Sequence, residues 1–336
     1  MSSEDELLEW LAQQSPLTRR IGNDGALLEA QRTGTVATVD TQIAGVHFPP
    51  DLDEALIARR LLAVNLSDLA AMGARPRQAF LSLTAPEGFD HRRFFESMLN
   101  SLDKHDTELA GGDLSRAVAC HAVLFLLGSP HRQGHCVRRD TAMPGDGLWI
   151  GGSLGDSALG QRLVARGARI RGRRVALPEI FDAAGTAQRR TAAAAVRRHL
   201  LPRAQLELGA WLATRRRSAA LDVSDGLALD ARRLARASRV GLEIDLPALP
   251  RISGYRSLCE RLGENPAELQ LGGGEDYVLL FTLPRRSQPP AELGASKIGR
   301  VLEETELRLV EAGGLTRPME ALGWDHLRRA SLSDRR

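Results

Sequence analysis

Six aspartates in this 336-residue chain stand among glycine, serine, threonine or asparagine rather than among other charged residues. They are Asp24, Asp40, Asp68, Asp113, Asp222 and Asp225. Each has apolar residues on one side and small turn-forming residues on the other, which is typical of the end of a strand or helix. Carboxylates that converge at such ends need cations, and hard divalent ions such as Mg²⁺ prefer carboxylate and water oxygens. The pattern therefore predicts phosphoryl chemistry on magnesium-bound phosphates.

Several of these aspartates also allow a structural interpretation. Asn65 and Asp68 are three residues apart, so they share one face of a predicted helix, which could simply be a solvated face. The segment Gly111–Asp113 could be a tight turn capped by its aspartate. Asp225 could serve as a helix N-cap, as could Ser224.

Three glycine-containing segments bear on the type of ligand. The run from Asp222 to Gly226 resembles the start of a calcium-binding loop, but position twelve is Arg233 instead of the required bidentate glutamate, so calcium is excluded. Gly151–Gly155 lacks the spacing of a dinucleotide-binding loop and is interpreted as a turn. Gly272–Gly274 would let the backbone approach a ligand closely, with Glu275 pointing at it.

Composition excludes other classes of protein. Hydrophobic residues make up 43% and charged residues 26%, as in an ordinary globular protein, and the net charge is +3. Aromatic residues are only 4%, too few for a base-stacking platform, so no nucleic-acid partner is predicted. Lys104 and Lys297 are the only lysines, and neither lies where a P-loop or a protein-kinase site needs one. Phosphate must therefore be held by metals, arginine and backbone N–H groups.

Cysteine usage and hydropathy also restrict the possibilities. The three cysteines have no metal-ligand spacing and leave an odd number, so no disulfide framework is predicted. No apolar run approaches membrane length, and the acidic first residues do not form a signal peptide. The sequence therefore predicts a cytoplasmic protein with no membrane partner.

Strands and helices are expected to alternate along the chain, which predicts an α/β or α+β class. The first expected elements are a helix over Leu7–Leu17, a strand over Thr35–Thr41 continuing through Gly45–Phe48, and a helix over Asp53–Met72 that Gly73 ends. A strand, turn and helix are expected over Ala219–Ser238. The turn at Met143–Asp146 predicts two domains, residues 1–143 and 144–336.

Taken together, these segments resemble the thiamine-monophosphate kinase family, within the aminoimidazole-ribonucleotide-synthetase-like superfamily. The resemblance covers nearly the whole chain in order. Its most specific parts are the run Asn65–Ala74 and the motif Gly-Gly-Glu-Asp-Tyr ending at Tyr277. The other matching segments are Ile21–Asp24, Asp40–Thr41, Gly45–Phe48, Gly111–Asp113, Arg139, Pro144–Asp146, Gly155–Ala158, Asp222–Gly226 and Gly323–His326.

The resemblance implies ATP-dependent phosphorylation of thiamine monophosphate to thiamine diphosphate, with several Mg²⁺ ions in a cleft. It implies a two-domain fold in which the N-terminal domain dimerises through its sheet, and hence a homodimer. No residue is expected to act as an acid or base, because the acceptor phosphate is already largely ionised at neutral pH. The implied metal-binding residues are Asp24, Thr38, Asp40, Asp68, Asp113, Asp222 and Asp225. The implied ATP-binding residues are Asp24, Gly112, Asp113, Arg139 and Ser224, and the implied substrate-binding residues are His47, Glu275 and Trp324.

The chain departs from the family pattern at four places. Asn23 stands where the family usually has a first aspartate, and Val39 stands where it has threonine. Arg139 is followed by Asp140 and Thr141 instead of small residues, and the stretch His199–Gln205 keeps only Pro202 and Arg203 of the usual Arg-Pro-x-Pro-Arg pattern. A divergent or non-catalytic nucleotide-binding homologue therefore remains an alternative. Another ATP-dependent enzyme of the superfamily is a second alternative. Selenophosphate synthesis is disfavoured because no cysteine precedes Cys120.

Overall fold

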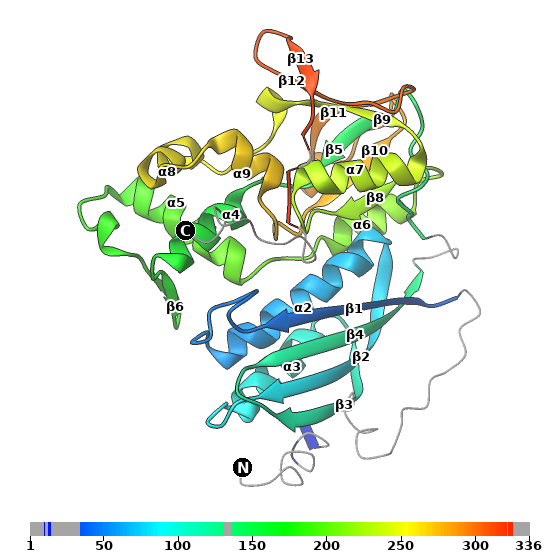
Figure 1. The fold of residues 1–336 in the computed structure, drawn as a ribbon. Coiled ribbons are helices and arrows are strands. Elements are labelled where there is room, and N and C mark those ends of the chain that lie inside the picture. The colour runs from blue at the N-terminus through cyan, green and yellow to red at the C-terminus, as the bar shows by residue number, and fades with distance from the viewer. Residues whose placement is uncertain (1–9, 11–12, 15–33, 131–135, 321, 325–336) are drawn as a thin grey trace.

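The computed structural model describes residues 10, 13–14, 34–130, 136–320 and 322–324. Two mixed β-sheets and their helices lie one above the other (Figure 1). We call residues 34–130 the N-terminal lobe and residues 136–320 the C-terminal lobe. The predicted helix over Leu7–Leu17 and the predicted site residue Asp24 lie outside the residues described as continuous structure. The mixed α/β class is confirmed.

The N-terminal lobe is a four-stranded sheet in the order β1-β4-β2-β3, with helices α2 and α3 against one face (Figure 1). All strand pairs are antiparallel except β2 with β3, which are parallel. The elements are β1 (Val36–Ile43), α2 (Glu54–Ala71), β2 (Ala74–Ala85), α3 (His91–Asp103), β3 (Glu108–Arg116) and β4 (His121–Pro130).

The C-terminal lobe is built on a seven-stranded sheet in the order β13-β12-β9-β11-β5-β10-β8. Its strands are β5 (Gly147–Ile150), β8 (Ala220–Asp222), β9 (Gly241–Asp245), β10 (Leu279–Leu283), β11 (Ser296–Leu302), β12 (Leu307–Val310) and β13 (Thr316–Pro318), and a separate hairpin is β6 (Arg169–Arg171) with β7 (Arg174–Ala176). Its helices are α4 (Asp156–Ala165), α5 (Thr186–Leu200), α6 (Leu206–Ala213), α7 (Leu227–Ser238), α8 (Tyr255–Leu262) and α9 (Pro266–Gly272), with 3-10 turns at Glu179–Phe181, Leu246–Ala248 and Ala291–Leu293.

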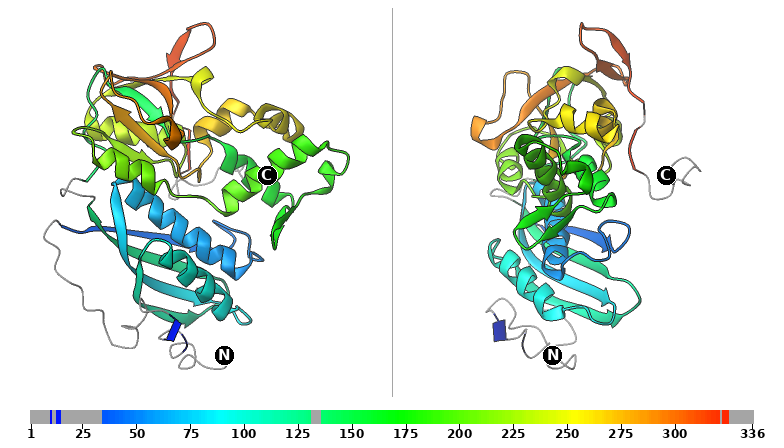
Figure 2. Two further views of the ribbon diagram at one scale, coloured as in Figure 1. Left: turned by 180° about the vertical axis from the view of Figure 1, so that it is seen from behind. Right: turned by 90° about the vertical axis from the view of Figure 1, so that its left-hand side faces the viewer.

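Helix α2 lies between the sheet of the N-terminal lobe and the C-terminal lobe, as Figure 2 also shows. Twelve of its 18 residues are buried, which is too many for a helix that covers only one sheet. Its first half packs on the N-terminal sheet, whereas Ala70 and Ala71 at its end pack with Leu208 and Phe281 of the C-terminal lobe. Asp53 caps its start by accepting a hydrogen bond from the N–H of Ala55.

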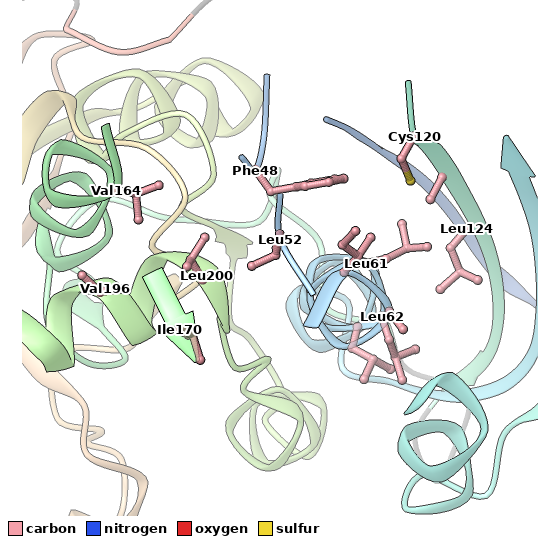
Figure 3. Close-up of a cluster of buried hydrophobic side chains, with 14 of the residues drawn as sticks. Phe48, Leu52, Leu61, Leu62, Cys120, Leu124, Val164, Ile170, Val196 and Leu200 are labelled. Atoms are coloured by element: carbon pink, nitrogen blue, oxygen red, sulfur yellow. The ribbon is translucent and has the colours of Figure 1, made fainter. Parts of the chain in front are cut away.

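One hydrophobic core continues across the boundary between the lobes (Figure 3). Phe48 and Leu52, from the loop between β1 and α2, lie between Leu61 of α2 and the side chains of Ile170 and Leu200. Burial of these side chains contributes about 1.5–3 kcal/mol each. The loop that carries His47 is therefore fixed on both sides.

Local structure differs from the sequence-based expectations in two places that matter for the site. Gly111–Asp113 is not a turn but the middle of β3, where a Cβ on Gly112 would lie 2.0 Å from the carbonyl oxygen of Leu81. Gly45–Phe48 is a turn rather than a continued strand. Among the helices that the structure describes, none is long and apolar enough to cross a membrane.

Candidate functional site

The centre of the site is formed where β1 faces α2. Alternate residues of a strand share a face, and here Thr38 and Asp40 point toward the helix. The Oγ1 of Thr38 donates a hydrogen bond to Oδ2 of Asp68. The N–H of Asp40 donates to Oδ1 of Asn65 at 3.1 Å, and Nδ2 of Asn65 donates to the carbonyl of Leu61 at 2.8 Å. Asn65 is fully buried, so the interpretation of a solvated polar face is wrong for this residue.

The same helix reaches the C-terminal lobe through its next residues. The buried hydroxyl of Ser67 donates to Oδ2 of Asp222 at 2.7 Å, across 155 residues of sequence. Asp222 is the last residue of β8, and its neighbour across the sheet is Leu279 of β10. Carboxylates from α2, β1 and β8 are thus brought together between the lobes.

These carboxylates oppose one another's ionisation. Burial, followed by the charges of Asp68 and Asp225, raises the pKa of Asp40 to about 7. Burial and the charge of Asp68 raise the pKa of Asp222 to about 8. Burial also raises the pKa of Asp68, although the Thr38 hydrogen bond and the charge of Arg139 act against it. An added cation would relieve this repulsion and favour the ionised forms.

Asp225 lies on the turn between β8 and α7, and its surroundings differ from those of the other aspartates. Nη1 of Arg233 is 2.6 Å from Oδ2 of Asp225 and 2.6 Å from Oδ1 of Asp230. Oδ2 of Asp230 accepts hydrogen bonds from the N–H groups of Ser224 and Asp225, both at 3.0 Å. The predicted N-cap role of Ser224 or Asp225 is therefore wrong: Gly226 occupies that position, and Asp230 inside the helix satisfies the two N–H groups instead.

A glycine-rich loop packs directly against this turn. A Cβ on Gly274 would lie 2.7 Å from the carbonyl oxygen of Ser224, so only glycine lets the two backbones approach. The N–H of Glu275 donates to that same carbonyl at 2.7 Å. The N–H of Trp324 donates to the carbonyl of Asp225 at 2.9 Å, while the Trp324 side chain is 57% exposed. Predicted substrate-binding and metal-binding residues therefore share one neighbourhood.

Glu275 is held by a residue that sequence reasoning missed. Nη2 of Arg60 forms an ion pair with Oε1 of Glu275, and Arg60 is fully buried in α2. Ser67 was missed as well, although helical spacing offered a signal, since Arg60, Ser67 and Asp68 lie seven and eight residues apart and share a face.

His47 and Arg139 lie close enough to the site to affect its carboxylates, whereas Val39 does not face it. His47 accepts a hydrogen bond at Nδ1 from the N–H of Ile43 at 3.1 Å and lies close enough for its charge to lower the pKa of Glu275. The positive charge of Arg139 likewise acts to lower the pKa of Asp68. Val39 points to the opposite face of the sheet from Asp40 and is 58% exposed.

Asp113 and Gly112 lie away from this cluster. The strand order places β3 three strands from β1, which is about 14 Å at ordinary strand spacing. The Asp113 side chain is exposed and accepts a hydrogen bond from the hydroxyl of Ser115 at 3.1 Å. Within one copy of the chain, Asp113 does not join the other aspartates.

Within the described ranges, no three carboxylate, histidine or cysteine side chains are arranged so that they could already hold a metal ion. The donor set is nonetheless chemically suited to Mg²⁺. Oxygen ligands predominate, and Asp40 and Asp222 have no basic side chain hydrogen-bonded to them in the parts of the chain described here. The fit is one of chemistry and charge rather than of a preformed cage.

Comparison with known proteins gives three findings. Residues 22–129 match the family described as AIR synthase related protein, N-terminal domain. The chain is 33% identical over 309 residues to the thiamine-monophosphate kinase of Aquifex aeolicus (strain VF5), covering 91% of this chain and 92% of the relative. It also resembles a solved structure described as AaThiL complexed with AMPPCP and TMP, with a TM-score of 0.74 and 30% identity over 96% of this chain and 97% of that one.

The fold extends to proteins of lower similarity. A hydrogenase maturation protein HypE, solved in complex with ATP, superposes with a TM-score of 0.68 at 20% identity over 92% of this chain and 90% of its own. At that identity the likeness concerns the fold alone. The aminoimidazole-ribonucleotide-synthetase-like fold expected from the sequence is confirmed.

Proposed function

The chain belongs to the thiamine-monophosphate kinase family, and on that premise we propose that it transfers the γ-phosphoryl group of ATP to thiamine monophosphate, giving thiamine diphosphate. The transfer would be direct and in line, between two phosphates whose negative charge bound Mg²⁺ would neutralise. The observation that carries the proposal is the set of mutually repelling carboxylates, Asp40, Asp68 and Asp222, gathered from both lobes beside the Glu275 loop.

Asp40, Asp68, Asp222 and Asp225 would hold the Mg²⁺ ions, together with Asp24, which lies outside the described residues. Mg²⁺ bound there supplies charge neutralisation that lets two anionic phosphates approach. Thr38 and Ser67 each donate one hydrogen bond to a carboxylate, which orients it and leaves its other oxygen able to bind metal. Arg139 would assist by binding a phosphate of ATP.

The chain needs no general base for this reaction. The acceptor is the phosphate of thiamine monophosphate, whose second pKa is near ~6, so it is largely ionised at neutral pH. The residues have only to position the two phosphates and exclude competing water. Ser224 would contribute a hydrogen bond to the nucleotide. The backbone near Gly112 would do so only from a second copy of the chain, since Gly112 lies away from the cluster within one copy.

His47, Glu275 and Trp324 would bind the thiamine part of the acceptor. Glu275 keeps an ionised carboxylate, because Arg60, His199 and His47 together lower its pKa to about 2 in spite of its burial. That carboxylate can accept hydrogen bonds from an amino group of the ligand. The largely exposed Trp324 ring offers a face on which a cationic heteroaromatic ring can stack.

The direct test is to incubate the purified chain with ATP, Mg²⁺ and thiamine monophosphate and to measure thiamine diphosphate by chromatography. We expect product with thiamine monophosphate and none with unphosphorylated thiamine, and no product in excess EDTA. ATP binding without product at high enzyme and Mg²⁺ would contradict the proposal and favour a non-catalytic homologue. ATP consumption with a different acceptor would favour another enzyme of the superfamily.

We also propose that the chain acts as a homodimer in which one copy supplies Asp113 to the site of the other. Asp113 lies on the sheet face opposite the helices, as do Val39 and Phe125, which are 58% and 38% exposed. Exposed apolar residues on an open sheet face are typical of an interface between subunits. The proposed division into domains at residues 143 and 144 fits this arrangement, since the first sheet ends at Pro130 and the second begins at Gly147.

Mixing two inactive variants tests the shared site. In a mixed dimer of Asp68→Asn and Asp113→Asn chains, one of the two sites has both native aspartates if Asp113 comes from the partner. Random mixing after subunit exchange then recovers up to about a quarter of native activity, as two-fold symmetry requires. No recovery despite demonstrated exchange would mean that each copy uses its own Asp113.

A further inference from the structure

Arg60 makes contacts in both lobes although it lies inside a buried helix. Its Nε donates a hydrogen bond to Oε1 of Gln42 on β1 at 2.7 Å. Its Nη1 donates to the carbonyl oxygen of His199 at the end of α5, and its Nη2 donates to Oε1 of Glu275. Because the guanidinium is planar and has donors in several fixed directions, it can bind all three acceptors at once.

The carboxylate of Glu275 is fixed on its second oxygen as well. Oε2 of Glu275 is 3.2 Å from Nδ1 of His199. Burial, followed by the charge of Arg60, keeps the pKa of His199 below its usual value, which favours the neutral ring. Since a carboxylate can only accept, Nδ1 of His199 must carry the proton, and the hydroxyl of Ser157 lies 3.2 Å from that nitrogen. Only a fifth of the Glu275 side chain is exposed, so a ligand would meet a carboxylate of set orientation.

The backbone of this loop also needs support. Glu275 and Tyr277 have φ angles of 65° and 49°, a region that residues other than glycine rarely adopt. Such conformations are unfavourable for residues with a Cβ and persist only where surrounding contacts impose them. The N–H of Tyr277 donates to the carbonyl of Val223 at 2.8 Å, and the Arg60–Glu275 ion pair restrains the loop from the other lobe.

We propose that Arg60 is a positioning residue for the acceptor substrate: through Glu275 it sets the carboxylate that receives the amino-substituted heteroaromatic part of the ligand. Because Arg60 belongs to the N-terminal lobe and Glu275 to the C-terminal lobe, the acceptor pocket is complete only when the lobes are docked on each other. This inference rests on the proposed function. Arg60 contacts none of Asp40, Asp68 and Asp222 among the hydrogen bonds and ion pairs of the described residues, so the nucleotide and metal side of the site should not depend on it.

The test compares Arg60→Met with Arg59→Met, a change at the adjacent, exposed position of the same helix. For Arg60→Met we expect the KM for thiamine monophosphate to rise about tenfold or more, the range for losing a charged hydrogen bond. The KM for ATP and the Mg²⁺ requirement should change by less than about twofold. Arg59→Met should leave all three unchanged. An equal rise in both KM values, or no rise for thiamine monophosphate, would overturn the inference.

A double-variant cycle shows whether Arg60 acts through Glu275. Glu275→Gln alone should raise the KM for thiamine monophosphate, and adding Arg60→Met to it should change that KM by less than about twofold further, since the two residues act as one unit. Independent, multiplying effects would overturn the inference. If Arg60→Met does not fold, Arg60→Lys serves instead: a lysine ammonium cannot reach all three acceptors, so we expect a smaller but still several-fold rise, and an unchanged KM would count against the inference.

These experiments distinguish a failure of the proposed function from a failure of the inference about Arg60. A native chain that makes no thiamine diphosphate would overturn the proposed function and this inference with it. A native chain that is active, with variants whose KM ratios do not separate thiamine monophosphate from ATP, would overturn the inference alone.

Discussion

Two polar clusters lie along α2, and they differ in how their charges are balanced. The first, which we call the carboxylate cluster, consists of Asp40, Asp68 and Asp222: burial raises the pKa of all three, and the negative charge of Asp68 raises the pKa of Asp40 and Asp222 further. The second, the arginine cluster, consists of Arg60, Glu275 and His199, in which charges and donors are matched. Arg60 and Asp68 are eight residues apart, or about 12 Å along the helix.

This difference in charge balance indicates that the carboxylate cluster binds a ligand, whereas the arginine cluster supports the structure around it. Charges that repel one another within a partly buried site are stable only when something else supplies the opposite charge, so the carboxylate cluster is suited to bind cations. The arginine cluster is already neutral overall and hydrogen-bonded, and it therefore fixes geometry rather than recruiting an ion. Both join the lobes, through the Ser67–Asp222 hydrogen bond and the Arg60–Glu275 ion pair.

The largest expected effect is on turnover, and it belongs to the carboxylate cluster. Asp68→Asn should lower kcat by about a thousandfold or more, because the lost metal contact removes several kcal/mol of charge stabilisation. Circular dichroism and the melting temperature should show an intact fold. Asp103→Asn, at an exposed aspartate of α3, is the matched control and should retain full activity. Full activity of Asp68→Asn would remove Asp68 from the metal site.

The next effect is on stability, and it belongs to the arginine cluster. Arg60→Met should lower the free energy of unfolding by about 3–5 kcal/mol, because the buried Glu275 carboxylate is left without its partner. Adding Glu275→Gln should restore a large part of that loss, since both charges are then absent. Denaturant titrations of the single and double variants give the comparison. A double variant less stable than Arg60→Met would contradict the charge balance.

The smallest expected effect is an increase in stability, and it belongs to the carboxylate cluster. Asp40→Asn should raise the free energy of unfolding in EDTA at pH 8 by about 1–3 kcal/mol, because it removes a negative charge that burial destabilises and that Asp68 and Asp225 also repel. Asp40 has a folded-state pKa of about 7, raised above its unfolded value, so the stability it contributes is present below about pH 4 and is lost as the pH rises through 7. The advantage of the variant should therefore shrink between pH 7 and pH 4.

Melting curves of the native chain and Asp40→Asn across that pH range make the measurement. Added Mg²⁺ should stabilise the native chain more than the variant at pH 8, since the variant lacks one proposed ligand. A variant that is less stable than the native chain in EDTA at pH 8 would mean that burial and the neighbouring charges do not destabilise the ionised Asp40 carboxylate.

Some of the site could be predicted from sequence because the signals are local. The helix over Asp53–Met72 follows from apolar spacing and from Gly73, and it is observed as Glu54–Ala71. The strand before Asp222 and the helix after Gly226 follow in the same way. The turn expected at Gly111–Asp113 is wrong: glycine and aspartate favour turns locally, but pairing with β2 makes this segment a strand.

The residue types of the site, and most of the helices and strands that carry them, follow from the amino-acid sequence alone. Which of those residues contact one another depends on how the two lobes pack, since Ser67 and Asp222 are 155 residues apart and Arg60 and Glu275 are 215 residues apart. Propensity and capping act between near neighbours in the chain, whereas burial and charge coupling depend on what packs against each residue from elsewhere. For that reason the aspartates were visible in the sequence, while the separation of Asp113 from them and the role of Arg60 were not.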